Sequence, residues 1–202
     1  MLKFANGDNL YFTSDIHGLH KNICYGTSIW DDKENNCRKF DNPNQMTDHI
    51  IDNINKEVKP DDHLFDLGDL LFHYKDVDSY RRFLNRFTCN NIYLLYGNHA
   101  HRENLAEACY DLPKIKFIGD YLEIQVGGKL ICMSHYPFTY WNDAHRESWN
   151  LFGHIHGKYV SEKKQLDVGI DSAFMVYGEY RPFSYNEIKT IMNTKQTIKH
   201  HG

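Results

Sequence analysis

The stretch "NLYFTSDIHG", residues 9–18, joins an apolar run to a polar turn. Residues 9–14 combine aromatic and β-branched side chains, which predicts a short strand. Asp15 and His17 follow at the point where this strand ends. Both are metal-ligand types, but a lone aspartate after a strand is usually a turn residue or a helix cap. The choice between these interpretations depends on the residues at the ends of the other strands.

The first half of the chain alternates between short apolar runs typical of strands and apolar residues at helical spacing. Apolar residues from Met46 to Val58 recur at helical spacing within residues 44–58, and Pro60 ends the pattern. Residues 63–68 and 91–97 are short apolar runs, which predicts two further strands. Asp76 is a candidate cap for a helix whose apolar face consists of Val77, Tyr80, Leu84 and Phe87. Strand, helix, strand, helix, strand is the order of an α/β protein with a parallel sheet.

The second half of the chain has mostly strand-like segments before a final helix. "KFIGDYLEIQV" (116–126), the glycine pair 127–128 and "KLICMSHY" (129–136) predict a β-hairpin. Residues 165–171 predict another strand, and residues 184–192 a final helix. The polar segment 31–45 is expected to be a long loop, and loops of that length are often functional.

The length of 202 residues suits a single domain, 1–202, whose last few residues we expect to be disordered. The net charge of −4 and the lack of an extended basic run argue against a stable complex with duplex nucleic acid. The five cysteines form no CxxC pair, which indicates free thiols in a reducing compartment. No signal peptide or membrane span is expected, so the predicted location is cytoplasmic.

Metal-ligand side chains follow each of five strand-like segments. They are Asp15 and His17, then Asp69, then Asn98 with His99, then His135, and finally His154 with His156. Ligands of open α/β sheets gather at the carboxyl ends of the strands, so we expect these five loops to converge. Each residue alone has an ordinary structural explanation, but the whole set points to a metal site.

The last of these loops lies in "NLFGHIHGKY", residues 150–159. In an extended segment, alternation would place the imidazoles of His154 and His156 on the same side. The flanking Gly153 and Gly157 would let the backbone approach closely and turn sharply.

The order D-x-H, G-D, G-N-H, a late histidine and G-H-x-H resembles the calcineurin-like metallophosphoesterases over roughly residues 9–190. "YFTSDIHGLHKNI", and "LDVGID" followed by "RPFSYNEI", resemble a small bacterial and phage branch of that family. Two positions depart from the wider family. Phe72 stands where a second aspartate is common, and Ala100 follows G-N-H where an acidic residue is usual. The small branch commonly has an aromatic residue at the first position, and the acidic residue usual at the second is not a metal ligand.

The resemblance implies an α/β/β/α sandwich of four layers with two mixed sheets, and a centre of two divalent ions. Asp15, His17, Asp69 and His156 would hold one ion, and Asp69, Asn98, His135 and His154 the other, with Asp69 as the bridge. The ligand types suit Mn, Fe, Zn, Ni or Mg, with Mn favoured. The implied activity is hydrolysis of a phosphomonoester or phosphodiester by a metal-bridging hydroxide, with His99 assisting the leaving group. The alternative is a binding scaffold without catalysis on the same fold.

The substrate is expected to be a small phosphorylated molecule, nucleotide-like in character. His20, Asn22, Arg38 and Tyr136 are candidate substrate contacts. Helix capping for His20 and Asn22, and a solvated surface position for Arg38 and its neighbour Lys39, are the competing interpretations. The aromatic residues within 135–149 could form a wall for a flat leaving group or pack the loop onto the core.

Overall fold

The computed structural model describes residues 1–72 and 76–199. The disorder expected for the last few residues falls partly on residues 200–202, which lie outside the described residues. One five-stranded sheet has the order β10-β2-β3-β4-β5. Its strands are β2 (Leu10–Thr13), β3 (His63–Asp66), β4 (Asn91–Leu95), β5 (Ile115–Gly119) and β10 (Phe183–Ser184). The strands β2 to β5 are parallel and β10 pairs antiparallel with β2. The predicted parallel sheet is therefore confirmed.

The second sheet is also mixed and has the order β1-β6-β7-β8-β9. Its strands are β1 (Leu2–Phe4), β6 (Tyr121–Val126), β7 (Lys129–Ser134), β8 (Trp149–Phe152) and β9 (Gln165–Asp167). Only β6 and β7 are antiparallel neighbours, joined through Gly127 and Gly128, while β7, β8 and β9 run parallel. The carboxyl ends of three parallel strands therefore lie together in this sheet as well.

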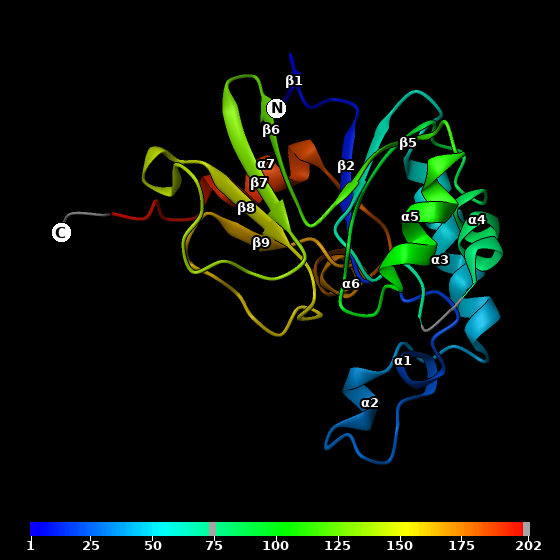
Figure 1. Cartoon of the computed structure of the whole chain (residues 1–202). Coiled ribbons are helices and arrows are strands. Elements are labelled where there is room, and N and C mark those ends of the chain that lie inside the picture. The colour runs from blue at the N-terminus through cyan, green and yellow to red at the C-terminus, as the bar shows by residue number, and fades with distance from the viewer. Residues whose placement is uncertain (73–75, 200–202) are drawn as a thin grey trace.

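Three helices pack on the outer face of the first sheet (Figure 1): α3 (Pro43–Glu57), α4 (Val77–Leu84) and α5 (Arg102–Tyr110). The predicted helical face of α3 is confirmed, because its apolar residues from Met46 to Ile54 are buried. Asn42 caps α3, and the Asp76 side chain accepts a hydrogen bond from the Ser79 backbone nitrogen at the start of α4. The two caps satisfy backbone donors that have no partner inside a helix.

One hydrophobic core lies under the helices α3 to α5, and a second lies between the two sheets. Phe12, Phe65 and Tyr93 stack across three neighbouring strands, with ring centroids 5.0 and 4.5 Å apart. The other sheet contributes Ile131 and Met133 to the same core. The helices α6 (Ile170–Tyr177) and α7 (Tyr185–Asn193) also add buried residues, among them Ala173, Ile188 and Met192. The opposite face of the second sheet packs against the loop residues Trp141 and Ala144 and against Ile198.

Two short helices form a lobe that projects from one end of the molecule (Figure 1). They are α1 (Lys21–Tyr25) and α2 (Lys33–Asn36). The prediction of one long loop over residues 31–45 is wrong in part, because α2 lies inside it and α3 begins at Pro43. Asp32 caps α2 by accepting from the Asn35 backbone nitrogen. Such a four-residue helix has no apolar period that sequence analysis could detect.

Two other expectations need correction. The segment 115–119 belongs to the first sheet as β5, so the hairpin consists of β6 and β7 alone. The strand expected over 165–171 ends at Asp167, because α6 begins at Ile170. The final helix is confirmed as α7, with Ser184 and Glu187 forming a capping box. Within the described residues, none of the helices is long and apolar enough to cross a bilayer.

Candidate metal centre

The five predicted loops do converge. The ligands follow the carboxyl ends of β2, β3 and β4 in one sheet and of β7 and β8 in the other. Backbone hydrogen bonds hold neighbouring loops together. The nitrogens of Asp15 and His17 donate to the carbonyl oxygens of Gly68 and Asp69, at 2.9 and 2.8 Å. The convergence predicted from strand ends is therefore confirmed, and both sheets supply residues to the site.

The ligand side chains form two clusters, each with its ligand atoms within 4.8 Å of one another. Asp15, His17 and His156 make the first cluster, and Asp69, His135 and His154 the second. The Asn98 side-chain oxygen lies 3.0 Å from His135 Nε2 and 2.9 Å from His154 Nδ1, so it joins the second cluster. All seven predicted ligand residues are thus brought together.

Asp69 lies between the clusters. Its Oδ2 atom is 3.4 Å from His135 Nε2 and 3.7 Å from His17 Nε2, so one carboxylate oxygen faces a histidine of each cluster. Its Oδ1 atom accepts a hydrogen bond from the His99 backbone nitrogen at 2.9 Å. This second contact fixes the rotation of the carboxylate, and it ties the G-D turn to the G-N-H turn.

Several buried polar atoms of the first cluster lack hydrogen bonds within the described part of the chain. They are Asp15 Oδ1 and both ring nitrogens of His17. Asp15 Oδ1 and His17 Nε2 are 3.7 Å apart, which is too long for a hydrogen bond. Buried polar groups are normally satisfied, so such a gap needs an explanation. Carboxylate and imidazole groups around it fit a divalent ion of the first transition row.

The ligand residues adopt strained backbone conformations. Among the nine non-glycine residues with positive φ in the described chain, five are ligands: Asp15, His17, Asp69, His154 and His156. This left-handed region costs a β-carbon-bearing residue about 1–3 kcal/mol, and such residues cluster at functional sites. The extended conformation expected for the 154–156 loop is therefore wrong. His154 and His156 have φ values of 71° and 49°, and each joins a different cluster.

Close backbone approaches require small residues beside the ligands. A β-carbon on Gly153 would lie 2.0 Å from Ser14 Oγ and 2.4 Å from Asp15 Oδ2. A β-carbon on Gly97 would lie 2.0 Å from Asp69 Oδ1. The predicted role of Gly153, which is to let the backbone approach closely, is confirmed. The close approach also allows the backbone nitrogen of the next residue, His154, to donate to Asp15 Oδ2 at 2.8 Å.

The electrostatic environment of Asp15, Asp69 and His17 favours the protonation states that bind metal. Burial raises the pKa of the Asp15 carboxyl, but its proximity to His17 and the charges of the other nearby histidines outweigh burial, so the net shift is downward. The pKa of Asp69 is likewise lowered, because contacts with His135 and His17 outweigh its burial. Burial lowers the pKa of His17. Ionised carboxylates and neutral imidazoles are the forms that bind divalent ions. At His135 and His156, burial lowers the pKa, but contacts with Asp69 and Asp171 outweigh it and the net shift is upward.

In His135 and His156, the ring nitrogen that points away from the ligand carboxylates, Nδ1, has a polar partner. His135 Nδ1 lies 2.9 Å from the Leu67 carbonyl oxygen, which fits donation to that acceptor. His156 Nδ1 lies 2.6 Å from Asp171 Oδ2. Metal-binding histidines commonly carry such a contact, because it fixes the tautomer and the ring orientation. In both rings the Nε2 atom then faces a ligand carboxylate, Asp69 or Asp15.

Arg38 is neither solvated nor a free clamp for phosphate, which corrects both interpretations. It is buried, and its Nε and Nη2 atoms each donate to one oxygen of Asp171 at 2.8 Å. Nη2 also donates to the Asp15 carbonyl oxygen, and Nη1 to that of Ile16. Arg38 therefore joins the lobe to the first ligand loop and to the start of α6. Its neighbour Lys39 is exposed, as the competing interpretation expected.

Of the other candidate substrate contacts, His20 and Tyr136 lie beside the site and Asn22 does not. His20 precedes α1, makes no side-chain cap, and stacks on Phe72 beside the site. Tyr136 is half exposed, and its ring meets that of His154 edge-on at 4.6 Å. Asn22 is exposed on α1 and does not line the cleft beside the centre, so its prediction as a substrate contact is not supported. Catalytic candidate His99 does line that cleft, with its ring 5.3 Å from that of His17.

The aromatic segment 135–149 mostly packs inward. Trp141 and Trp149 are buried in two different cores, and Phe138 packs against the first of these. Tyr140 is 62% exposed, and Tyr136 alone of the five contacts a ligand ring in the described structure. The packing interpretation is therefore supported for both tryptophans.

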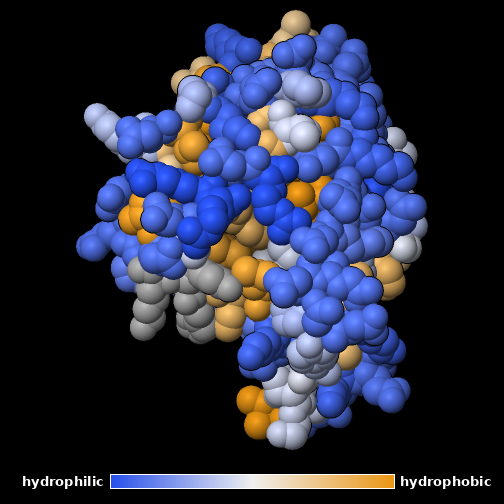
Figure 2. Space-filling view, turned by 90° about the vertical axis from the view of Figure 1, so that its right-hand side faces the viewer, coloured by the Kyte–Doolittle hydropathy of each residue, from blue (hydrophilic) through white to orange (hydrophobic). Residues whose placement is uncertain are grey.

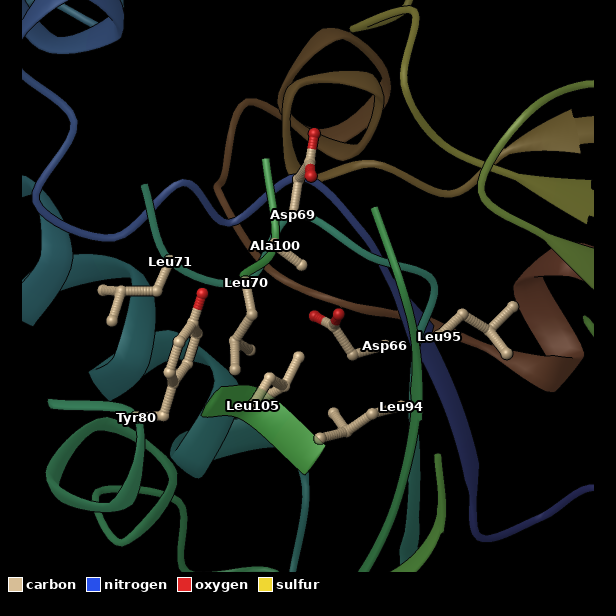
Figure 3. Close-up of a pocket in the computed structure, with 9 residues that line it drawn as sticks. All are labelled: Asp66, Asp69, Leu70, Leu71, Tyr80, Leu94, Leu95, Ala100 and Leu105. Atoms are coloured by element: carbon tan, nitrogen blue, oxygen red, sulfur yellow. The ribbon is translucent and has the colours of Figure 1, made fainter. Parts of the chain in front are cut away.

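Asp66 is buried under the site rather than in it. Its carboxylate points into a narrow apolar cavity, whereas that of Asp69 points away from the cavity (Figure 3). Oδ1 accepts from the Gly68 nitrogen at 3.0 Å, so Asp66 shapes the turn that carries Asp69. Burial in this cavity, which has no room for water, raises the pKa of Asp66 well above its usual range.

Two residues of this site were not predicted. Asp171 supports His156 through the contact with its Nδ1 atom, and Asp167 accepts hydrogen bonds from the nitrogens of Gly157 and Gly169, both at 2.7 Å. Burial raises the pKa of Asp167 to about 6. Both residues follow or end β9, so the strand-end argument, extended to a sixth strand, would have found them.

Comparisons with known proteins give relatives without a stated activity. No family model matches the chain. It is 23% identical over 197 residues to the uncharacterized protein MJ1445 of Methanocaldococcus jannaschii, with 94% of each chain covered. It is also similar to the crystal structure of AQ665 from Aquifex aeolicus, a protein of unknown function. That likeness has a TM-score of 0.60 and 25% identity, and covers 90% of this chain and 98% of the other. The likeness to the AQ665 structure supports the mixed α/β architecture.

Proposed function

We propose that the protein is a phosphoesterase that works with two divalent metal ions. The observation that carries the proposal is the position of Asp69, whose one carboxylate oxygen faces histidines of two adjacent ligand clusters. A bridging carboxylate between two sets of N and O ligands is the arrangement expected of a two-metal hydrolase. Asp15 and Asp69 carry two negative charges, so two divalent ions would leave a net charge of about +2 that attracts a phosphoryl group.

The architecture supports the resemblance to calcineurin-like metallophosphoesterases. Two mixed sheets face each other, and helices cover the outside of the first. We place the fold with the four-layer sandwich of that family, with a reduced fourth layer. A loop with the short helical turn Ala144–Arg146, together with Ile198, takes the place of outer helices.

The residues of the chain divide the chemical work. Bound ions would supply a nucleophile by lowering the pKa of water, and would neutralise charge on the phosphoryl oxygens. His99 lines the cleft, and its backbone nitrogen donates to Asp69, so we assign to its imidazole the protonation of the leaving oxygen. On the second cluster, the half-exposed ring of Tyr136 lies against that of His154, which keeps Tyr136 as a candidate substrate contact.

The test is metal-dependent hydrolysis. The protein would be stripped of metal, supplied in turn with Mn, Fe, Zn, Ni or Mg, and assayed with a chromogenic phosphomonoester and a chromogenic phosphodiester. We expect metal to restore turnover, with Mn most effective. Asp69→Ala should abolish turnover and metal retention, and His99→Ala should reduce turnover about 10²–10⁴-fold while metal is retained. Asp52→Ala, at an exposed site on α3, is the matched control.

The opposite result favours a scaffold. If the folded wild-type protein hydrolyses neither ester with any metal, the catalytic proposal fails for these substrates. Metal content measured by mass spectrometry then separates a metal-binding protein without turnover from a site that holds no metal.

A further inference from the structure

A cleft of about 580 Å³ opens beside the first metal-ligand cluster. His17, His99 and His156 line one end of it. One wall comes from the lobe, through Ile29 and Trp30, and the other from α6, through Phe174 and Met175. The volume falls within the range of sites for small organic molecules. A phosphoester held at the ligand cluster would therefore extend its organic group between the lobe and α6.

The walls of this cleft are apolar and partly aromatic. Ile29 is 85% exposed, Met175 62% and Phe174 43%, so the cleft offers a group of exposed apolar side chains. Phe174 is held in place because its ring stacks on Tyr180, with centroids 4.3 Å apart and planes 12° from parallel. Hydrophobic side chains also show in the hollow between the body and the projecting lobe (Figure 2). A rigid aromatic ring on such a wall suits a flat group.

The charge of the cleft excludes a highly anionic organic group. Among the described lining residues, the cationic side chains are Arg38 and Lys158. Arg38 is committed to Asp171 and to two backbone carbonyl oxygens. Asp31 and Asp32 of the lobe line the same cleft, and their two negative charges exceed the single positive charge of Lys158. A nucleic-acid strand or a second phosphate group would need clustered cations here, as phosphate recognition generally does.

We propose that this cleft selects a small phosphoester whose organic group is flat and carries no further negative charge, as in a nucleoside monophosphate. The proposal rests on the phosphoesterase function for the reaction, but the cleft itself exists independently of turnover. Segment 29–37 of the lobe and the exposed face of α6 are then the parts that determine specificity.

The hydrolysis test compares three substrates with the metal-loaded protein: adenosine monophosphate, glycerol phosphate and adenosine 3′,5′-bisphosphate. We expect kcat/KM to be highest for adenosine monophosphate, by about tenfold, which corresponds to the stacking of one base. Phe174→Ala should raise KM for adenosine monophosphate by a similar factor and leave glycerol phosphate within about twofold, because glycerol makes no stacking contact. Tyr110→Ala is the control, since Tyr110 is 89% exposed at the end of α5 and lies outside the cleft.

A binding measurement separates this proposal from the catalytic one. Adenosine itself should bind the metal-free protein and quench the fluorescence of Trp30, and Phe174→Ala should weaken that binding about tenfold. Trp30→Ala identifies the responding tryptophan, because Trp141 and Trp149 are buried. Adenosine binding without hydrolysis of any ester would overturn the phosphoesterase proposal and support the cleft. Hydrolysis with equal kcat/KM for all three substrates, unchanged by Phe174→Ala, would overturn the cleft proposal alone.

Discussion

His156 and Asp171 are joined by a 2.6 Å contact between ring atom Nδ1 and a carboxylate oxygen. The same carboxylate accepts hydrogen bonds from two nitrogens of buried Arg38. Arg38 also donates to the Asp15 carbonyl oxygen in the first ligand loop. The charge of Arg38 contributes to lowering the pKa of Asp171, so this carboxylate is ionised when it meets His156. A histidine ligand, its supporting acid and the lobe are thus parts of one network.

Asp171→Asn should weaken metal binding at the first cluster. The loss of charge leaves His156 less firmly oriented and less basic, and changes to such supporting residues typically cost about 10–100-fold in metal affinity. The measurement is a Mn titration in competition with a chelator. Asp52→Asn serves as the control, and equal affinities for wild type and Asp171→Asn would contradict the assigned role.

Arg38→Ala should destabilise the protein by about 3–5 kcal/mol, because Arg38 is buried and its loss leaves the part-buried carboxylate of Asp171 without its cationic partner. Arg38→Lys should restore little, since an ammonium group cannot make the paired contact and reach both carbonyl oxygens. Urea unfolding measures both variants. Arg146→Ala, at a side chain that is 72% exposed, should change stability little, and a similar loss there would show that the effect is not specific.

The loss of unfolding free energy at acidic pH should depend on Asp171. Its pKa in the folded protein lies below its ordinary value, so the folded state holds the ionised form more strongly than the unfolded state does. The resulting stability is present above about pH 4, the ordinary pKa of aspartate, and is lost as the pH falls further. We expect the unfolding free energy of the metal-free protein to fall between about pH 4 and 2, and less steeply in Asp171→Asn. Parallel curves for the two proteins would refute this assignment.

Gly153→Ala should disrupt both clusters at once. The new β-carbon would collide with Ser14 and with the Asp15 carboxylate, and the displaced loop carries both His154 and His156. We expect loss of metal binding, measured by metal content after gel filtration. Gly128→Ala is the control, because no atom lies within 4 Å of its β-carbon and only backbone strain of about 1–2 kcal/mol is added. Retained metal in Gly153→Ala would show that the loop tolerates displacement.

The strand-end ligands were predictable because parallel strands that follow one another deliver their carboxyl ends to one edge of a sheet. Asp15, Asp69 and Asn98 needed only that rule and a correct assignment of three strands. His135, His154 and His156 needed the second sheet to face the first, which the order of motifs in the resembled family supplied. The sequence-based prediction of α3 succeeded because its apolar period is long and regular.

The role of Arg38 was not predictable from its neighbourhood. It lies in a polar segment where most side chains are exposed, and its partner Asp171 is 133 residues away. Burial of such a residue depends on tertiary packing, which local composition does not encode. The left-handed backbone of His154 and His156 was missed for a related reason: the hydrogen bond from His154 to Asp15, 139 residues away, helps to set the turn.

The division of the ligands between two sheets has a consequence for the order of events during synthesis. A nascent chain that ends before residue 130 can hold Asp15, His17, Asp69 and Asn98 but none of the three later histidines. The strands β2 to β5 leave the ribosome before these histidines do, so they are present while neither cluster of candidate ligands is complete. Metal capture would then be delayed until the chain has passed residue 156, and its onset in truncated chains would serve as a marker of how far assembly has progressed.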